Sequence, residues 1–459
     1  MSEMNFPSDW VKSSISDIAQ VNPKKIDADP DTISGFVPMA LAPISFSGSL
    51  GYEEKLWREI KKSYTNFQND DVIFAKVTPC FENGKAAIVK GLPNGIGAGS
   101  SEFYVLRPHA PHILPQILLA LIKTQKFASE GAQNMTGAVG LRRVPRAFVE
   151  SFSIPVIPIA EQKVIAEKLD TLLVKVEATK ARLESSLETL KQFRQSVLAA
   201  AVSGKLTEDR VENFNHVKLS DVATFQNGFA FKSGWFKAEG EFQVVKLGNI
   251  REGRLALENA PAFIDEAMAS EYSKFMPNAG DSLISMTGTR FKKDYGFSCL
   301  VEEQKNILIN QRVGRIIPEC YKLSPMYLNI ILRSEQFRND FFKGETGGVN
   351  QGNVGSKHIM SIEIDVPDLD TQNEIVRKVQ KCMDYSEIIE KKIEDALERV
   401  NNLTISILAK AFRGELTKQW REDNPELVSG ENSAEVLLEK IKAERVAAKP
   451  KRKVRKKAE

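Results

Sequence analysis

The sequence repeats itself at an offset of 210 residues, and no other feature restricts the possible folds as strongly. The matches run without a gap over more than 130 positions. They include Asp71 with Asp281, Pro108 with Pro318, Pro115 with Pro325, Phe127 with Phe337, Thr136-Gly137 with Thr346-Gly347, Gln162 with Gln372, and Ile165 with Ile375. Nearer the N-terminus the offset becomes 206, which aligns Phe36 with Phe242. A collinear repeat of this period predicts a duplicated domain rather than a solenoid.

Each copy has the same internal order. About 150 residues mix short β-branched and aromatic runs with Gly, Pro and Asn breaks, which is typical of an α+β domain. A proline-marked boundary follows, and then a long helical stretch. We therefore expect two similar α/β domains joined by two long helices. The predicted segments are a first domain at 1–157, a first helix at 158–207, a second domain at 208–365, a second helix at 366–418, a C-terminal segment at 419–448 and a basic disordered tail at 449–459.

The two helical stretches carry apolar residues at alternating spacings of four and three, which is the seam of a coiled coil. The predicted seam residues are Ile165, Leu169, Leu172, Val176, Leu183, Leu190, Val197, Ile375, Val379, Ile389, Ile393, Val400, Leu403 and Ile407. Two ordinary core helices in separate domains are the alternative, although such helices average only about 11–12 residues. If a pseudo-twofold axis relates the copies, the second helix leads back and the two helices pair antiparallel. Two different domains on one chain would then suit the reading of two different DNA half-sites.

Several segments also resemble a known family. They are EQKVIAEKLDTLL at 161–173, KQFRQSVL at 191–198, GKLTE at 204–208, the run from Glu398 to Leu427 that contains GELTKQW, and SGENSAEVLLEKIKAER at 429–445. These segments resemble the conserved regions of type I restriction–modification specificity subunits, and are most similar to the K-type (IA) branch. The two globular domains show no target-specific match, as expected where specificity lies.

The resemblance implies target-recognition domains that read a split sequence in double-stranded DNA. It implies two methyltransferase subunits bound along the helices and two restriction subunits added to form the endonuclease. It also implies N6-adenine methylation from S-adenosylmethionine, with ATP- and Mg-dependent cleavage, as chemistry of those partners and not of this chain. The expected location is the bacterial cytoplasm. Outward-facing helix positions are candidates for methyltransferase contacts, and a solvated helix face explains them equally well: Gln162, Lys163, Arg194, Gln195, Gln372, Arg377 and Lys378.

No catalytic or metal-binding motif stands out. Gly95–Gly99 resembles a nucleotide-binding glycine loop, but a strand-like run follows it, so we expect a loop between strands. Gly352–Lys357 lacks the Gly-Lys-Ser/Thr end of a phosphate loop. Pro367-Asp368 with Glu390–Lys392 fits a nuclease pattern only across the predicted coiled coil. The four histidines and four cysteines show no metal-ligand spacing, and no run predicts a signal peptide or a membrane span.

Charge adds a constraint on DNA binding. The tail at 449–459 holds seven basic residues and one acidic residue, so the remainder holds 56 basic and 59 acidic residues and is slightly negative. A chain that held DNA alone through phosphate contacts would be more basic. Partner subunits are therefore expected to supply part of the electrostatic attraction.

Two polar regions recur in each domain and are the candidates for base contacts. The first region contains Lys76, Thr78, Asn83 and Lys85, and its counterpart contains Thr287, Thr289, Arg290, Lys292 and Lys293. The second region contains Thr136, Arg142, Arg143 and Arg146, and its counterpart contains Thr346, Asn350, Gln351, Asn353 and Lys357. Gln226, Asn227 and Lys232 are weaker candidates. Solvated surface loops are the plainer interpretation of any single position.

Three functions remain open on the sequence alone. The first is a non-catalytic DNA-specificity subunit. The second is a specificity protein that works with a methyltransferase but without a restriction subunit. The third is a coiled-coil adaptor that binds proteins and not DNA, which the slightly acidic body favours and the paired polar regions disfavour.

Overall fold

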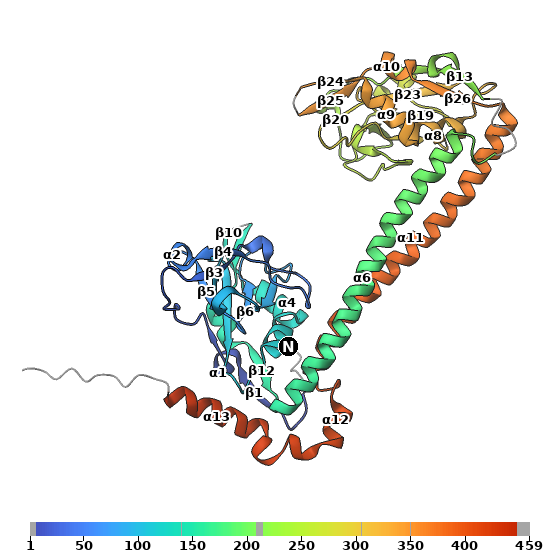
Figure 1. The fold of residues 1–459 in the computed structure, drawn as a ribbon. Helices are drawn as coiled ribbons and strands as arrows, with labels where there is room; N and C mark the ends of the chain where they lie inside the picture. The colour runs from blue at the N-terminus through green and yellow to red at the C-terminus, as the bar shows by residue number, and fades with distance from the viewer. Residues whose placement is uncertain (1–5, 139, 208–213, 304, 349, 448–459) are drawn as a thin grey trace, which may run out of the picture. The chain divides into compact units, whose positions relative to one another are not determined.

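A computed structural model of the chain describes residues 6–138, 140–207, 214–303, 305–348 and 350–447 (Figure 1). The predicted disordered tail at 449–459 lies outside the described residues. The chain forms two compact units: unit 1 comprises Met1–Glu184 and Asp395–Glu459, and unit 2 comprises Ser185–Glu394. Both unit boundaries fall inside long helices, α6 (Ile159–Val202) and α11 (Leu369–Phe412). No helix within the described residues is long and apolar enough to cross a membrane.

Unit 1 packs short strands against helices. Its strands are β1 (Val11–Ser14), β2 (Ala19–Val21), β3 (Ile33–Val37), β4 (Glu53–Leu56), β5 (Thr65–Gln68), β6 (Val72–Ala75), β7 (Ala86–Ile88), β8 (Ile96–Gly99), β9 (Phe103–Pro108), β10 (Thr136–Ala138), β11 (Leu141–Arg143) and β12 (Ser153–Val156). Its other helices are α1 (Ile15–Ile18), α2 (Trp57–Ile60), α3 (Pro115–Ile122), α4 (Gln125–Gln133), α5 (Arg146–Ser151), α12 (Lys418–Asp423) and α13 (Ala434–Ala447), with 3-10 turns η1 (Met39–Leu41), η2 (Pro93–Gly95), η8 (Pro425–Leu427) and η9 (Gly430–Asn432).

The sheets of unit 1 have the orders β2-β9-β6-β7, β4-β3-β8-β5, β1-β12 and β10-β11. The main core lies between the first of these sheets, helices α3 to α5 and the long helices. The prediction of a loop at the glycine run is wrong, because Ile96–Gly99 is strand β8. A Cβ at Gly97 would lie 2.5 Å from the carbonyl oxygen of Gly35 on the neighbouring strand, so these glycines permit close strand packing.

Unit 2 repeats this plan. Its strands are β13 (Asn215–Lys218), β14 (Ala223–Asn227), β15 (Phe242–Val245), β16 (Ile250–Arg251), β17 (Arg254–Leu255), β18 (Phe263–Ile264), β19 (Ser282–Ser285), β20 (Thr287–Thr289), β21 (Ser298–Leu300), β22 (Ile307–Ile309), β23 (Val313–Pro318), β24 (Glu345–Gly347), β25 (Gln351–Val354) and β26 (Glu363–Val366). Its other helices are α7 (Glu266–Glu271), α8 (Pro325–Arg333), α9 (Glu335–Lys343) and α10 (Ser356–Ser361), with 3-10 turns η4 (Leu219–Asp221), η5 (Ser233–Trp235), η6 (Leu247–Asn249) and η7 (Ser273–Phe275).

The predicted duplication is confirmed by the strand connections. The sheet β14-β23-β19-β21 of unit 2 has the strand order of β2-β9-β6-β7 in unit 1. The parallel pair β3–β8 corresponds to β15–β22, and β1–β12 corresponds to β13–β26. Even helix caps recur: Thr124 accepts a hydrogen bond from the backbone of Phe127, and Ser334 accepts one from Phe337, both at 3.2 Å.

The long helices pair antiparallel inside each unit. In unit 1 the first turns of α6, with Ile165 and Leu169, share a core with Ile407 and Ala411 near the end of α11. In unit 2 the last turns of α6, with Leu198, share a core with the first turns of α11. Most of the predicted seam residues are buried or half-buried, whereas Leu403 is 48% exposed. Residues beside the predicted seam, such as Leu173 and Leu408, are also buried because each helix packs on a globular domain as well as on its partner.

A glutamine joins each long helix to its domain. The prediction that Gln162 and Gln372 face outward is wrong, because both are almost fully buried. Gln162 accepts from the backbone N–H of Leu114 and donates to the carbonyls of His112 and Ile157. Gln372 accepts from Ser324 and donates to Lys322 and Pro367 in the same pattern. The amide satisfies three backbone groups that burial would otherwise leave unpaired, which explains why it recurs.

The C-terminal segment is held to unit 1 by a buried carboxylate. Glu161, at the start of α6, accepts hydrogen bonds from the indole of Trp10 at 2.8 Å and from Thr417 and Arg421 at 2.5 Å. Arg421 also donates to the carbonyl of Gly414 at 3.0 Å. A buried charge persists only when it is paired and hydrogen-bonded, so these partners explain the Gly-Glu-Leu-Thr run at 414–417.

Loop 43–48 of unit 1 packs against the C-terminal end of α3 and the middle of α6. The ammonium of Lys123 donates to the carbonyls of Ile44 and Gly84 at 2.7 and 2.5 Å. The carboxylate of Glu177 accepts hydrogen bonds from the backbone N–H groups of Phe46 and Ser47 and from the Ser47 hydroxyl. Burial lowers the pKa of Lys123 to about 8, although the nearby Glu177 opposes that shift.

The lowered pKa of Lys123 predicts a pH-dependent stability. Below pH 8, Lys123 is protonated in both the folded and the unfolded chain, and burial of its charge destabilises the folded state. As the pH rises from about 8 towards the ordinary pKa of 10.5, the folded chain loses this proton before the unfolded chain does, so the cost disappears. Relative to Lys123→Met, the wild-type chain is expected to gain on the order of 1–3 kcal/mol of unfolding free energy over that range. Urea unfolding of both proteins at pH 7.5, 9 and 10 measures this difference. Parallel pH profiles of the two proteins would contradict the assignment.

Candidate nucleic-acid interface

The two polar regions predicted in the second domain come together in one ribbon of unit 2. Strand β20 pairs with β25, which places Thr287 opposite Asn353 and Thr289 opposite Gln351. Strand β24 pairs with the other edge of β25 and places Thr346 opposite Asn353. The strands lie side by side at one edge of the unit (Figure 1). Because paired residues point to the same side of a sheet, all five polar side chains share one face.

Glycines form the opposite face of this ribbon. Gly288 and Gly352 lie between the polar positions of β20 and β25, and Gly347 follows Thr346 on β24 and pairs with Gly352. A Cβ at Gly352 would lie 2.2 Å from the hydroxyl of Tyr295, and a Cβ at Gly288 would lie 2.7 Å from its ring. Glycine is therefore required on this side, where the backbone rests on Tyr295. On the other side Gln351 and Thr346 are exposed and Thr289 and Asn353 are half-buried, whereas Thr287 is buried.

A carboxylate fixes the base of the ribbon. Glu345 on β24 accepts from the Tyr295 hydroxyl at 2.5 Å and from the guanidinium of Arg290 at 3.1 Å. Burial and the neighbouring Glu345 together raise the pKa of Tyr295. Tyr295 therefore stays protonated and donates, which keeps the strand end and Arg290 in place.

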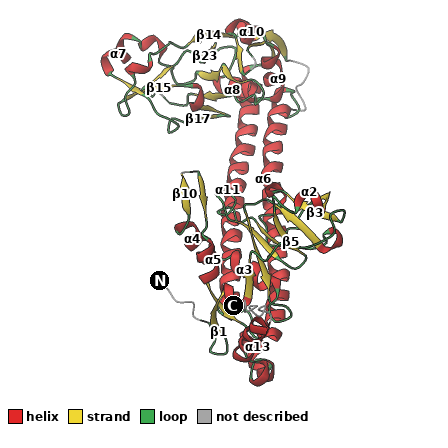
Figure 2. Ribbon diagram, turned by 90° about the vertical axis from the view of Figure 1, so that its left-hand side faces the viewer, coloured by secondary structure: helices red, strands yellow, loops and turns green. Residues whose placement is uncertain are grey.

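The first domain builds a ribbon at the equivalent place in unit 1. Strands β10 and β11 form a hairpin that projects from the body of the unit (Figure 2), and Val77 forms a β-bridge to Arg143 on its other edge. The backbone N–H of Thr78 donates to Arg142 at 3.0 Å, and the backbone N–H of Arg142 donates to the Thr78 hydroxyl at 3.0 Å. The two predicted regions of this domain therefore also lie side by side.

The recurring Thr-Gly pair has a backbone cause. Gly137 has φ of +126° and Gly347 has φ of +121°. A Cβ at these positions would lie 2.6 Å from the carbonyl of Leu141 and 2.2 Å from that of Gln351, on the neighbouring strand. Only glycine fits both the positive φ and the close approach, so the pair marks the start of each ribbon.

Glu102 orients the cationic side chains of the first ribbon. Arg143 donates two hydrogen bonds to this carboxylate at 2.9 and 2.8 Å, and the ammonium of Lys76 lies 4.0 Å from it. The hydrogen bond from Arg143 lowers the pKa of Glu102, so the carboxylate stays ionised and keeps both cations beside it. The two ribbons thus share a plan but display different side chains: Thr136 and Arg143 on one face and Arg142 on the other in unit 1, and mainly Gln, Asn and Thr on one face in unit 2.

Other predicted contact residues lie beside the ribbons or make hydrogen bonds within the protein. Asn83, Asn350, Lys292 and Lys357 are exposed. Lys85 donates to the carbonyl of Met39, and Arg146 donates to that of Val21. Lys293, at φ of +47°, places its ammonium 5.0 Å from the ring centre of Phe342. Among the weaker candidates, Gln226 accepts a hydrogen bond from Arg315 and so serves the fold.

Several residues of these surfaces were not predicted from the sequence. Glu102 and Glu345 have no sequence signal for base contact, because side chains that read bases are mostly basic, amide or hydroxyl groups. Phe291 is 78% exposed beside Arg290, and Leu141 is 52% exposed on β11. Glu345, Phe291 and Leu141 lie inside or next to a predicted polar region, whereas Glu102 lies outside both predicted regions of its domain.

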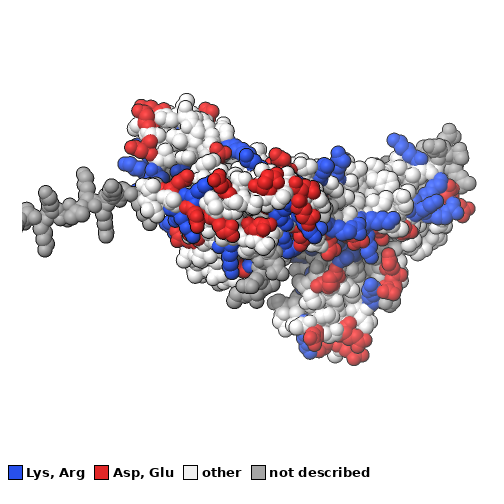
Figure 3. Space-filling view, turned by 90° about the horizontal axis from the view of Figure 1, so that it is seen from below, with Lys and Arg blue, Asp and Glu red and all other residues white. Residues whose placement is uncertain are grey.

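Charge is mixed over the molecular surface. On the face shown in Figure 3, lysines and arginines are interspersed with aspartates and glutamates and do not form one broad basic area. This agrees with a body that carries slightly more acidic than basic residues. Binding through these surfaces would therefore depend on specific contacts more than on a general attraction to phosphates.

The family model and similar curated proteins all point to one family. The sequence matches the type I restriction modification DNA specificity domain twice, over residues 7–189 and 211–399. It is 37% identical to the specificity subunit of the type I restriction enzyme EcoKI of Escherichia coli K12, over 71% of each chain. It is 37% identical to the EcoBI specificity subunit of Escherichia coli over 70% of each chain, and 30% identical to the EcoDI subunit of the same species over the full length of both.

Solved structures show the same fold at low sequence identity. A chain from a study of complex assembly and conformational transition of the type I R-M system aligns with a TM-score of 0.71 at 18% identity, covering 89% of this chain and 99% of that one. The HsdS subunit from Thermoanaerobacter tengcongensis aligns with a TM-score of 0.54 at 19% identity, covering 89% and 98%.

Proposed function

We propose, since the chain belongs to the family of type I restriction–modification specificity subunits, that its two ribbons read the two halves of one split and asymmetric DNA site. The observation that carries this proposal is the pair of ribbons built at equivalent places from different side chains. A β-ribbon fits the major groove, where amides suit adenine and arginines suit guanine. Different side chains on the two ribbons then imply different half-sites.

We also propose that two methyltransferase subunits and two restriction subunits bind this chain. Each unit leaves large apolar side chains exposed on its part of the long helices, which single-chain proteins normally cover. These residues are Val174, Leu403 and Ile405 in unit 1, and Phe193, Tyr385 and Ile388 in unit 2. Partner helices packed on these surfaces would remove them from water.

In this proposal the chain itself performs no catalysis. The partner subunits bind S-adenosylmethionine, ATP and Mg, methylate adenine within the site, and cleave DNA whose site lacks methylation. Adenine methylation requires the base to leave the duplex, so the specificity subunit has to hold the flanking sequence while the partner acts. The proposed location is the bacterial cytoplasm, where the DNA is.

Methylation mapping in cells tests the function directly. Cells that express the chain with its methyltransferase partner are sequenced for methyladenine and compared with cells that express the partner alone. One split motif that appears only with the chain present is the expected result. No new methylation, with assembly and partner activity both demonstrated, would contradict DNA reading and favour a protein-binding adaptor. An adaptor would also show no salt-dependent binding to random DNA.

A further inference from the structure

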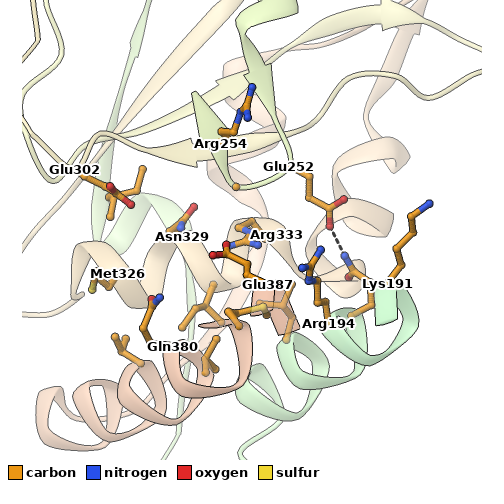
Figure 4. A pocket seen from close by; sticks show the side chains of 18 residues that line it. Lys191, Arg194, Glu252, Arg254, Glu302, Met326, Asn329, Arg333, Gln380 and Glu387 are labelled. Atoms are coloured by element: carbon orange, nitrogen blue, oxygen red, sulfur yellow. Dashed lines mark hydrogen bonds between the residues drawn. The ribbon is translucent and has the colours of Figure 1, made fainter. Parts of the chain in front are cut away.

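Unit 2 contains a cavity between the long helices and its globular domain. Its volume is about 480 Å³, which is within the usual range for ligand sites. Helices α6, α8 and α11 form its floor, with apolar residues such as Leu198, Ile330 and Val379. The hairpin β16–β17 lies over it (Figure 4).

Polar atoms without partners face this cavity. Among the described residues, Arg333 Nε, Asn329 Oδ1 and Gln195 Oε1 are buried and have no hydrogen-bond partner. Burial lowers the pKa of Arg333, while the carboxylates of Glu252 and Glu387 oppose that shift. Figure 4 places Arg333 near the centre of the cavity, with Glu387 and Glu252 around it. Unpaired buried groups are costly, so an occupant that satisfied them would bind favourably.

The duplication shows how the equivalent place in unit 1 is filled. At the offset of 210, Arg333 corresponds to Lys123 and Glu387 corresponds to Glu177. In unit 1 both charges are satisfied by the backbone of loop 43–48: the lysine by the carbonyl of Ile44, and the carboxylate by the N–H groups of Phe46 and Ser47. The ring of Phe46 packs on the main core of that unit.

The corresponding segment of unit 2 does not fill its cavity. At the offset of 206, loop 43–48 corresponds to residues 249–254, which contain the turn of the β16–β17 hairpin. The turn lies against the guanidinium of Arg333, where a Cβ at Gly253 would come within 2.5 Å of Cζ, but its hydrogen bonds go elsewhere. Gly253 donates to the carbonyl of Ser298 at 2.9 Å, and Glu252 accepts from Gln195. Phe46 is replaced by Glu252, so unit 2 lacks the aromatic side chain. No hydrogen bond to Glu387 occurs among the described residues.

We propose that this cavity of unit 2 binds a polypeptide loop of a partner subunit, in the manner in which loop 43–48 fills unit 1. The loop offers an aromatic side chain for the apolar floor, two consecutive backbone N–H groups for Glu387, and a backbone carbonyl for Arg333. Each of these groups has its counterpart in unit 1. The assignment to a partner subunit rests on the proposed complex, whereas binding of the loop itself does not.

A peptide with the sequence of residues 42–50, acetylated, amidated and fluorescently labelled, is the probe. Its binding to the full chain is measured by fluorescence anisotropy. Saturable binding is expected, weakened at least tenfold by Phe46→Ala in the peptide and by Glu387→Gln or Arg333→Met in the chain. Glu387 is exposed, so its substitution should not impair folding. Glu398→Gln, at an exposed position of the same helix outside the cavity, is the matched control and should leave binding unchanged.

Competition identifies the source of the natural loop. Adding the unlabelled methyltransferase subunit, and then the restriction subunit, should release the labelled peptide in at least one case. No saturable binding at millimolar peptide, or equal binding by wild type and Glu387→Gln, would overturn the cavity as a loop site. Binding that neither partner displaces would overturn the assignment to a partner. Neither result bears on DNA reading, because methylation mapping reports that function separately.

Discussion

Replacing Arg315 with methionine is expected to destabilise unit 2 by about 3–5 kcal/mol, because it leaves Asp281 charged and buried without its cation. Both side chains are less than one-tenth exposed. The guanidinium donates to Asp281 at 2.6 Å, to the side chain of Gln226 at 3.0 Å and to the carbonyl of Met276 at 3.1 Å. Methionine retains much of the volume and makes none of these bonds.

The first copy provides a matched comparison. Asp71 accepts two hydrogen bonds from Arg107, each at 2.8 Å, but the Arg107 side chain is 24% exposed. Water can therefore hydrate part of the site after Arg107→Met, and a smaller loss of about 1–3 kcal/mol is expected. The double variant Asp281→Asn with Arg315→Met should recover part of the loss, since it removes the unpaired charge.

Hydrogen exchange measured on peptides from β19 and β23 distinguishes unfolding of unit 2 from that of unit 1. Urea unfolding of the whole chain then supplies the free energies. If Arg315→Met cost less than 1 kcal/mol, or if Arg107→Met cost more than Arg315→Met, the buried pair would not be the main support of this sheet.

The same ion pairs show what the sequence could and could not predict. The offset of 210 aligned the two aspartates, which also accept from the backbone N–H three residues earlier, at Gln68 and Asn278. It did not align their arginines, which differ by 208. Residues two apart on a strand point to the same face, so either position can reach the carboxylate. A one-dimensional comparison cannot detect a partner that has moved by one such step.

The helices were predictable because their signal is local and periodic. The heptad pattern indicated two uninterrupted helices, and both are single helices of 44 residues. The pattern could not show that buried glutamines at 162 and 372 would dock the helices onto their domains, because a polar residue near a helix start usually faces water. It also could not show that Thr417 and Arg421 surround Glu161, since that contact joins residues more than 250 positions apart.

The ribbons were predicted in part. Recurrence at a fixed offset identified the polar regions, and the structure brings them together in both units. The face of each side chain depends on strand register, and glycine-rich segments specify register weakly from sequence. For the same reason the sequence did not separate residues of the polar face, such as Gln351 and Asn353, from Lys85 and Arg146, which bind backbone carbonyls.

Substituting alanine for both Gln351 and Asn353 is expected to lower methylation of the specific site by about 10²–10⁴-fold, because each amide that pairs with a base contributes roughly 1–3 kcal/mol. Both side chains lie on the polar face of the β20-β25-β24 ribbon, opposite Thr289 and Thr287. Neither has a partner in the main core of unit 2, so the variant should keep its fold.

The decisive measurement is which half of the DNA motif loses its base preference. A randomised library of sites, methylated by the reconstituted methyltransferase, should show relaxed base preference in one half of the motif and an unchanged preference in the other. Thr136→Ala with Arg143→Ala, two residues that pair across the ribbon of unit 1, should relax base preference in the other half. A uniform decrease at all bases, with a smaller dependence on salt, would indicate that these side chains contact phosphates. In that case base reading would have to lie elsewhere in each unit, and the exposed Phe291 and Leu141 beside the ribbons would be the next residues to vary.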